Sequence, residues 1–293
     1  MTERPLTCII IPVHNRRKLT LQCLDSLQWC AALADWRIVL VDDGSTDGTA
    51  DAVRSQYAHV EIVHGSGDLF WTGAMRLGMQ RALELGADVL VWLNDDTTPD
   101  EASLRRISSI VRAQPDMVLA PRVLIGDEIT NCNSLRRRPA PVTGEEFDVA
   151  DMLAGFQVAF STKVIEKIGL PDDRRWPHYA GDGSYTHTAH KQGFRILVDS
   201  RSHIRLSGFE PYLSIGEVFW SGTKPLSQRI SSCFFAKKSK FRLSTQWHFD
   251  VLQRGLVGAG MVFPARLILW AVQILRHRMD SALCGPDRER LCS

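Results

Sequence analysis

The strongest constraint on the fold comes from residues 89–96, whose sequence is VLVWLNDD. The five apolar residues predict a strand that is buried on both faces of a sheet. This strand carries two adjacent carboxylates, Asp95 and Asp96, at its end, and open α/β sheets bind ligands at the carboxyl ends of their strands. Two carboxylates in such a place repel each other unless water or a cation offsets the charge. A hard divalent cation, itself bound to a phosphate ligand, meets that need.

Strand-like and helix-like segments alternate over residues 7 to 120. Apolar runs predict strands at 7–13, 36–41, 60–63 and 89–93. Between the last two, Thr72 is expected to cap a helix that buries Met75, Met79, Ala82 and Leu83. The alternation predicts an α/β fold in which helices cover both faces of a mostly parallel sheet. After Pro121 the rhythm changes, and further strands are expected at 153–160 and 194–198.

The composition is that of an ordinary globular protein, with 44% apolar and 23% charged residues in a chain of 293. A formal net charge of +2 gives no general case for nucleic-acid binding. The seven cysteines occur singly, which fits a reducing cytosol better than a disulfide framework. The N-terminus lacks the basic start, apolar core and cleavage site of a secretory signal. These features predict a cytoplasmic protein.

The C-terminal tail differs in kind from the rest of the chain. Residues 234–249 mix aromatic side chains with four basic ones, and residues 256–275 are largely apolar but are interrupted by Pro264 and Arg266. A membrane-spanning helix needs about 20 apolar residues with few charges. The pattern therefore favours an amphipathic helix lying in the plane of a membrane surface. A core-packing helix or a dimer interface is the plainer alternative, and nothing in the sequence specifies an oligomer.

Polar residues also follow the other predicted strands. The loop after the first strand contains Pro12, His14 and Asn15, and the loop after the second contains Asp43 within the sequence DDGSTDG. Parallel strands share a direction, so these loops should open at the same sheet edge as Asp95. An aspartate there can accept hydrogen bonds from a ribose or a nucleobase imide, although a plain surface turn would have the same composition.

A glycine-containing connection precedes the helix near residue 72. Its residues Gly67, Asp68 and Trp71 lie where backbone at a helix start can approach a phosphate. The segment is neither a Walker A loop nor a dinucleotide-binding turn. A simple connection is the alternative for this segment taken alone.

Taken in order, these motifs resemble those of family-2 glycosyltransferases. The segments that carry the resemblance are CIIIPVHN at 8–15, VDDGSTDGT at 41–49 and LNDD at 93–96. The segment GDLFWTGAM at 67–75 resembles the rhamnosyltransferase-like branch, and the similarity continues through 153–156, 168–172 and 179–185. The resemblance implies the GT-A fold, a nucleotide-binding α/β part joined to an acceptor region. We accordingly expect a nucleotide-sugar part at 1–125, an acceptor and catalytic-base part at 126–225, and a helical, basic and apolar tail at 226–293.

The resemblance also implies roles for single residues. Residues 94–96 match the Asp-x-Asp motif with Asn94 as the first residue, so Asp96 is expected to bind Mg²⁺ or Mn²⁺ directly, with Asp95 assisting. His203 stands where some relatives place a metal-binding histidine, although a hydrogen-bonded structural histidine is the alternative. Asp182 matches the general base of inverting members. The residues expected around the donor nucleotide are Pro12, His14, Asn15, Asp43, Gly67, Asp68, Trp71, Arg76, Asn94 and Asp95.

Aromatic residues are expected on the acceptor side, because aromatic faces suit the C–H side of a sugar. The candidates are Phe156, Trp176 and Tyr179, and core packing is the alternative for each of them alone. The chain also departs from the family pattern at three positions. Gly181 replaces the usual Glu before Asp182, Thr188 stands where many relatives have Arg, and Arg76 stands where many have Asn.

The implied function is that of an inverting glycosyltransferase. The donor would be a nucleoside diphosphate sugar, with dTDP-rhamnose suggested by the branch resemblance. The acceptor would be a glycan or a lipid-linked oligosaccharide of a surface polysaccharide, reached from the inner face of the plasma membrane. A metal-dependent sugar nucleotidyltransferase and a degenerate, non-catalytic nucleotide-sugar-binding protein are the alternatives.

Overall fold

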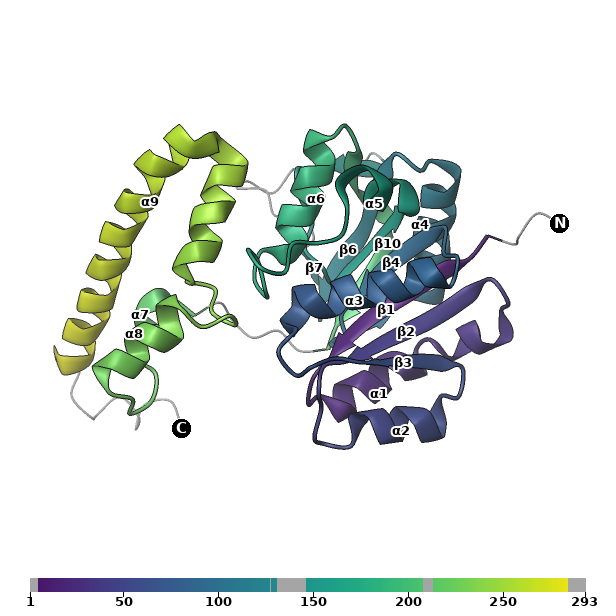
Figure 1. Ribbon diagram of the computed structural model, residues 1–293, viewed down its shortest axis with the longest axis horizontal. Coiled ribbons are helices and arrows are strands. Elements are labelled where there is room, and N and C mark those ends of the chain that lie inside the picture. Colours follow the sequence, from purple (N-terminus) through teal and green to yellow (C-terminus); the bar gives the residue numbers. More distant parts are fainter. Residues whose placement is uncertain (1–4, 127, 131–145, 208–212, 284–293) are drawn as a thin grey trace. The chain divides into compact units, whose positions relative to one another are not determined.

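A computed structural model describes residues 5–126, 128–130, 146–207 and 213–283. The chain divides into two compact units, Met1–Phe209 and Glu210–Ser293 (Figure 1). Residues 213–225, which we expected to belong with the acceptor region, fall within the second unit.

The first unit is built on a mixed sheet. Four parallel strands lie in the order β3 (Val60–His64), β2 (Trp36–Asp42), β1 (Thr7–Val13) and β4 (Val89–Leu93). The next strand, β9 (Gln157–Ser161), runs antiparallel to both of its neighbours. The sheet continues with β6 (Met117–Ile125), the parallel β10 (Arg195–Leu206) and the antiparallel β5 (Thr97–Pro99), while β7 (Glu128–Thr130) pairs with β6 and β8 (Phe147–Val149) pairs with β10.

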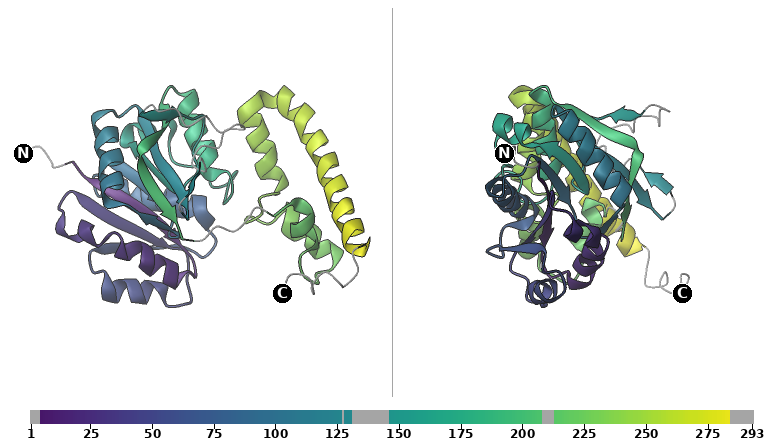
Figure 2. Two further views of the ribbon diagram at one scale, coloured as in Figure 1. Left: turned by 180° about the vertical axis from the view of Figure 1, so that it is seen from behind. Right: turned by 90° about the vertical axis from the view of Figure 1, so that its right-hand side faces the viewer.

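Helices cover both faces of this sheet (Figures 1 and 2). One face carries α1 (Arg17–Asp25), α2 (Thr49–Gln56) and α4 (Glu101–Ala113), and the other carries α3 (Phe70–Glu84), α5 (Thr162–Ile168) and α6 (Gly181–Lys191). Side chains alternate between the faces along each strand, so that Ile9 and Ile11 pack on the first face and Cys8 and Ile10 on the second. Each fully buried Ile or Leu contributes roughly 1.5–3 kcal/mol to stability.

The start of α3 differs from the prediction. The helix begins at Phe70, so Thr72 is buried within its first turn and does not cap it. Met75, Met79 and Ala82 are buried as expected, whereas Leu83 is 38% exposed. The buried face of the helix is therefore narrower than the sequence pattern indicated. Leu83 follows Ala82 directly, so its side chain is rotated away from the sheet and toward solvent.

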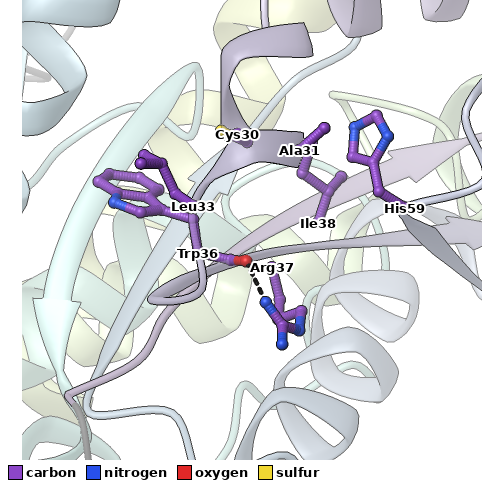
Figure 3. Close-up of a pocket in the computed structure, with 7 residues that line it drawn as sticks. All are labelled: Cys30, Ala31, Leu33, Trp36, Arg37, Ile38 and His59. Atoms are coloured by element: carbon purple, nitrogen blue, oxygen red, sulfur yellow. Dashed lines mark hydrogen bonds between the residues drawn. The ribbon is translucent and has the colours of Figure 1, made fainter.

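A small cavity of about 160 Å³ lies at the amino-terminal end of β2, beside the short helix η1 (Gln28–Ala32) (Figure 3). Trp36 and His59 are among the residues that line it. Because β2 starts at Trp36, this cavity lies at the edge of the sheet opposite to the ends that carry the aspartates.

The second unit consists of α7 (Ile215–Trp220), α8 (Leu226–Phe234) and α9 (Leu243–Leu283). Ser214 and Glu217 form a capping box at the start of α7. Helix α9 is interrupted at Gly255, whose φ of 70° and ψ of 176° are not helical, so it consists of two arms. Ile215, Phe219 and Cys233 form a small core on which Trp270 and Ile274 of the second arm pack.

Candidate active site

The two carboxylates after β4 are bridged by an arginine from the loop after β1. Arg16 Nη1 lies 2.9 Å from Asp95 Oδ1, and Arg16 Nη2 lies 3.0 Å from Asp96 Oδ2. Thr20 Oγ1 donates a further hydrogen bond to Asp95 Oδ2 at 3.2 Å. Burial raises the pKa of Asp95 to about 6, although Arg16 acts in the opposite direction. Arg16 therefore supplies part of the positive charge that the acid pair requires.

Asn94 is held from two sides. The indole Nε1 of Trp71 donates to Asn94 Oδ1 at 2.8 Å, and the backbone N–H of Asn94 donates to the carbonyl of Phe156 at 3.0 Å. The amide oxygen thus provides the acceptor that the indole needs. An aspartate at this position would add a third negative charge beside Asp95 and Asp96.

Asp182 lies in the first turn of α6, where the helix dipole favours a carboxylate. Its Oδ2 accepts a hydrogen bond from the Gly155 N–H at 2.8 Å, and its Oδ1 accepts one from the Gly183 N–H at 2.7 Å. Burial raises the pKa of Asp182, and the backbone hydrogen bonds oppose this shift. The carboxylate is thereby positioned by main chain on two sides.

Gly155 and Phe156 connect these two groups. Gly155 donates to Asp182, and its neighbour Phe156 accepts from Asn94. A Cβ at position 155 would overlap the ring of Trp71 and would lie 3.2 Å from Asp182 Cβ. The segment leading into β9 therefore brings Asp182 to the same edge of the sheet as residues 94–96, a link that local sequence patterns do not indicate.

Asp43 organises the loop before α3. Its carboxylate accepts hydrogen bonds from the backbone N–H groups of Gly67 at 2.7 Å, Leu69 at 2.9 Å and Phe70 at 3.0 Å. His14 Nδ1 donates to the Asp43 carbonyl at 2.6 Å. Asn15 Oδ1 accepts from the Thr46 N–H at 2.7 Å. The predicted donor-side residues of these loops are thus joined by direct hydrogen bonds.

Backbone strain is concentrated at this edge of the sheet. Among the described residues, the non-glycine residues with positive φ are Asn15 at 51°, Phe70 at 55° and Ala180 at 65°. They lie after β1, at the start of α3 and immediately before α6. Such conformations cost about 1–3 kcal/mol each and cluster at functional sites.

The predicted acceptor-side aromatics differ in exposure. Tyr179 is 39% exposed and packs edge-on against His178 at a ring distance of 4.8 Å. Phe156 is half-buried, whereas Trp176 is buried. Arg76, on α3, donates from Nη1 to the Pro171 carbonyl at 3.1 Å.

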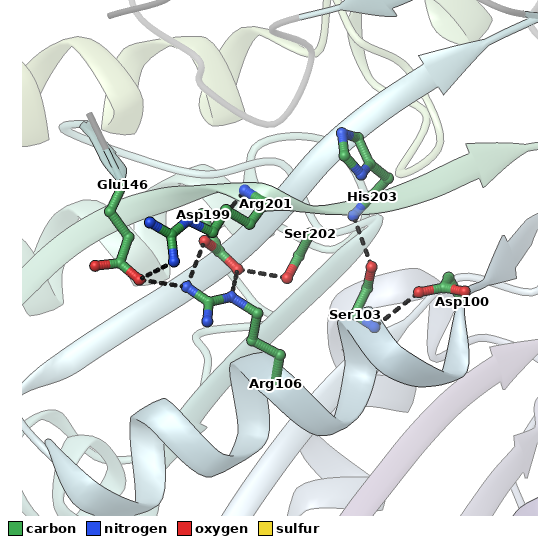
Figure 4. Close-up of polar contacts among 8 residues, drawn as sticks. All are labelled: Asp100, Ser103, Arg106, Glu146, Asp199, Arg201, Ser202 and His203. Carbon is green, nitrogen blue, oxygen red and sulfur yellow. Dashed lines mark hydrogen bonds and ion pairs between the residues drawn. The ribbon is translucent and has the colours of Figure 1, made fainter. Parts of the chain in front are cut away.

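His203 contacts a different set of residues from those described above. Its backbone N–H donates to Ser103 Oγ at 2.9 Å (Figure 4). His203 also lines an open pocket of about 480 Å³ together with Asp100. Nearby, the buried Asp199 pairs with Arg106 at 2.8 Å. Over the part of the chain that the structure describes, no three His, Cys, Asp or Glu residues are grouped to hold a metal ion, so His203 is not clustered with Asp95 and Asp96.

The family model described as glycosyl transferase family 2 matches residues 8–169, which is more than half of the chain. This chain belongs to glycosyl transferase family 2.

Relatives of this family-2 chain include enzymes that act on polyprenol substrates. Polyprenol monophosphomannose synthase of Mycolicibacterium smegmatis is 28% identical over 183 residues, which cover 58% of this chain and 67% of that enzyme. Undecaprenyl-phosphate mannosyltransferase of Micrococcus luteus is 30% identical over 44% of this chain and 53% of that enzyme. The second alignment therefore spans about half of the relative's length.

A solved structure shows the same fold. The mannosyltransferase PcManGT of Pyrobaculum calidifontis, in complex with GDP-Man and Mn²⁺, has a TM-score of 0.53 and 16% identity, covering 95% of this chain and 83% of the other. The predicted GT-A fold is confirmed.

The structure explains one departure from the family pattern. A Cβ at position 181 would overlap Thr72 Oγ1, and Thr72 Cβ would lie 3.1 Å away. The N–H of Thr72 donates to the Pro177 carbonyl at 3.1 Å, which fixes α3 against the loop before α6. Thr72 therefore occupies the space that a side chain at position 181 needs.

Proposed function

We propose that this protein is an inverting glycosyltransferase that moves a sugar from a nucleoside diphosphate sugar to a hydroxyl of a glycan or a lipid-linked oligosaccharide. The observation that supports the proposal is the pair of hydrogen bonds by which Gly155 binds Asp182 and its neighbour Phe156 binds Asn94. Direct displacement at an anomeric carbon needs a proton acceptor for the attacking hydroxyl and a cation site for the leaving diphosphate. Asp182 and the acid pair at one edge of the sheet could supply these two functions.

The residues present suit a divalent cation. Asp96 Oδ1 is a buried carboxylate oxygen for which no described residue donates a hydrogen bond. Asp96 would hold Mg²⁺ or Mn²⁺, with Asp95 assisting, and the Mn²⁺ in the Pyrobaculum mannosyltransferase complex supports this choice of ions. When bound, the cation would stabilise the charge of the leaving diphosphate. His203 remains a predicted ligand only.

Asp182 is the proposed general base. Its carboxylate would take the proton of the acceptor hydroxyl as that oxygen attacks the anomeric carbon from the face opposite the diphosphate. One displacement of this kind inverts the anomeric carbon. The two backbone N–H groups that hold Asp182 would keep the carboxylate oriented during proton transfer.

Asp43 is the residue proposed to recognise the nucleobase. A carboxylate offers about four lone-pair positions, and three backbone donors use three of them. One position is left for an imide N–H of a donor base. Pro12 and His14 would flank that base.

The proposed donor is a rhamnosyl nucleotide and the proposed acceptor is lipid-linked. Segment 67–75 favours a rhamnosyl donor such as dTDP-rhamnose. The polyprenol-linked substrates named for the mycobacterial and Micrococcus relatives favour a lipid-linked acceptor, and hence peripheral membrane contact.

The test is a panel of nucleoside diphosphate sugars with and without Mn²⁺, followed by analysis of the nucleotide product. Glycosyl transfer releases a nucleoside diphosphate, whereas the nucleotidyltransferase alternative would release pyrophosphate. Asp96→Ala is expected to lose metal-dependent donor binding, and unchanged metal affinity in this variant would redirect the ligand assignment. If no donor on the panel is turned over or hydrolysed although one binds, the non-catalytic alternative holds.

A further inference from the structure

The second arm of α9 exposes an unusual amount of apolar surface. The packed seam of this arm recurs at helical spacings of three and four and comprises Ala259, Val262, Phe263, Arg266, Trp270, Ile274 and His277. The remaining surface presents exposed apolar side chains: Leu256, Val257, Met261, Leu267, Ile268, Leu269, Val272, Leu275 and Met279. By length and composition alone, Leu243–Met279 is long and apolar enough to cross a membrane. Only 6% of its most apolar 18-residue stretch is buried.

This exposed surface is free of charge over 20 residues. Residues 256–275 contain a single charged side chain, Arg266. Arg266 lies on the inner side, where its Nη1 pairs with the fully buried Asp250 of the first arm at 2.7 Å. Arg254 pairs with the same carboxylate at 3.1 Å. The buried carboxylate of Asp250 thus pairs with both arginines on the inner side of the unit. The next arginines along the arm, Arg276 and Arg278, are exposed.

Contacts along the seam restrict the orientation that this arm can take relative to a membrane. Near its start, Phe263 packs edge-on against Trp247 of the first arm at a ring distance of 5.5 Å. Near its end, Trp220 Nε1 of α7 donates to the Ile274 carbonyl at 2.9 Å. A helix that crosses a bilayer would carry the packed first arm, with its charged Asp250 and Arg254, into the hydrocarbon, which is costly. The arm can instead lie in the membrane plane, with the seam toward the protein and the opposite side in lipid.

We propose that the second arm of α9, residues 256–279, is an in-plane anchor that binds the surface of an anionic lipid bilayer. Residues 213–283 contain ten Lys and Arg against three Asp and Glu, which complements anionic headgroups. Arg276 and Arg278 would reach these headgroups from the end of the inserted arm. The inference refines the proposed membrane contact and is independent of the sugar chemistry.

The experiment is flotation of the full-length protein with vesicles of phosphatidylcholine, with or without added phosphatidylglycerol. We expect binding to the anionic vesicles that weakens as salt is raised, because salt screens the headgroup attraction. Ile268→Glu places a charge at a position that is 66% exposed on the proposed lipid-facing side. This substitution should weaken vesicle binding about tenfold or more. Leu83→Glu, at a partly exposed leucine of α3, is the matched control and should bind like the wild type.

Three results would overturn the anchor. The first is vesicle binding by Ile268→Glu equal to that of the wild type, and the second is failure of the wild type to bind anionic vesicles. The third is a wild-type dimer that Ile268→Glu dissociates, without any lipid binding. The last result would assign the surface to a second copy. Failure of sugar transfer would not bear on the anchor, because the readout is lipid binding.

Discussion

At the scale of single residues, Asp182 combines a burial that raises its pKa with two backbone hydrogen bonds that oppose the shift. Only the ionised carboxylate can accept a proton. We therefore expect kcat/KM to rise with pH through a pKa above the ordinary 3.8 of aspartate and to level off beyond it. A profile without this acidic limb would argue against Asp182 as the base.

Replacing the same carboxylate separates chemistry from binding. Asp182→Asn should lower transfer by about 10²–10⁴-fold, because the proton acceptor is removed, while donor affinity measured by calorimetry is retained. Asp51→Asn, at an exposed acid of α2, is the matched control. Near-normal turnover of Asp182→Asn would remove this residue from the mechanism.

Arg16 was not anticipated from the sequence, although it directly follows the PVHN segment. Because its guanidinium bridges Asp95 and Asp96, it competes with a cation for the same oxygens. Arg16→Gln should raise the affinity for Mn²⁺ in the absence of donor by about tenfold, equivalent to about 1.4 kcal/mol. Calorimetry of Mn²⁺ binding would measure this, with Arg17→Gln as the neighbouring control. Unchanged or weaker Mn²⁺ binding by Arg16→Gln would refute the competition.

At the scale of elements, the packing of α3 against the start of α6 depends on the absence of a side chain at position 181. Gly181→Ala should lower the free energy of unfolding by about 1–3 kcal/mol, because its Cβ overlaps Thr72. Adding Thr72→Ala removes the nearest atom and should recover part of this loss in denaturant unfolding. Gly260→Ala, at an open helical position of α9, is the control and should not destabilise. Purely additive effects at positions 181 and 72 would contradict the packing account.

At the scale of the whole molecule, the two units should respond to different ligands. A nucleoside diphosphate with Mn²⁺ should slow hydrogen exchange in the loops at 14–16, 43–47 and 65–70, because these loops form the proposed donor site. Anionic vesicles should slow exchange at 256–279 instead. Asp96→Ala should lose the first effect and keep the second. Protection of the tail by the nucleotide alone would contradict this separation of roles.

The local features of this protein could be predicted from its sequence. Strands β1, β2 and β4 follow from apolar runs, and the acids at their ends follow from motifs within a few residues, because period and turn chemistry are short-range properties. The order of the motifs also sufficed for the family and for the GT-A fold.

Tertiary structure alone decided how distant residues meet. The antiparallel β9 brings Gly155 between Asp182 and Asn94, Arg16 reaches residues 80 positions away, and Asp43 binds the loop at 67–70. The same long-range packing buries Trp176. No local pattern specifies these contacts, since each depends on how separate strands are ordered in the sheet and on which side chains then compete for the same space.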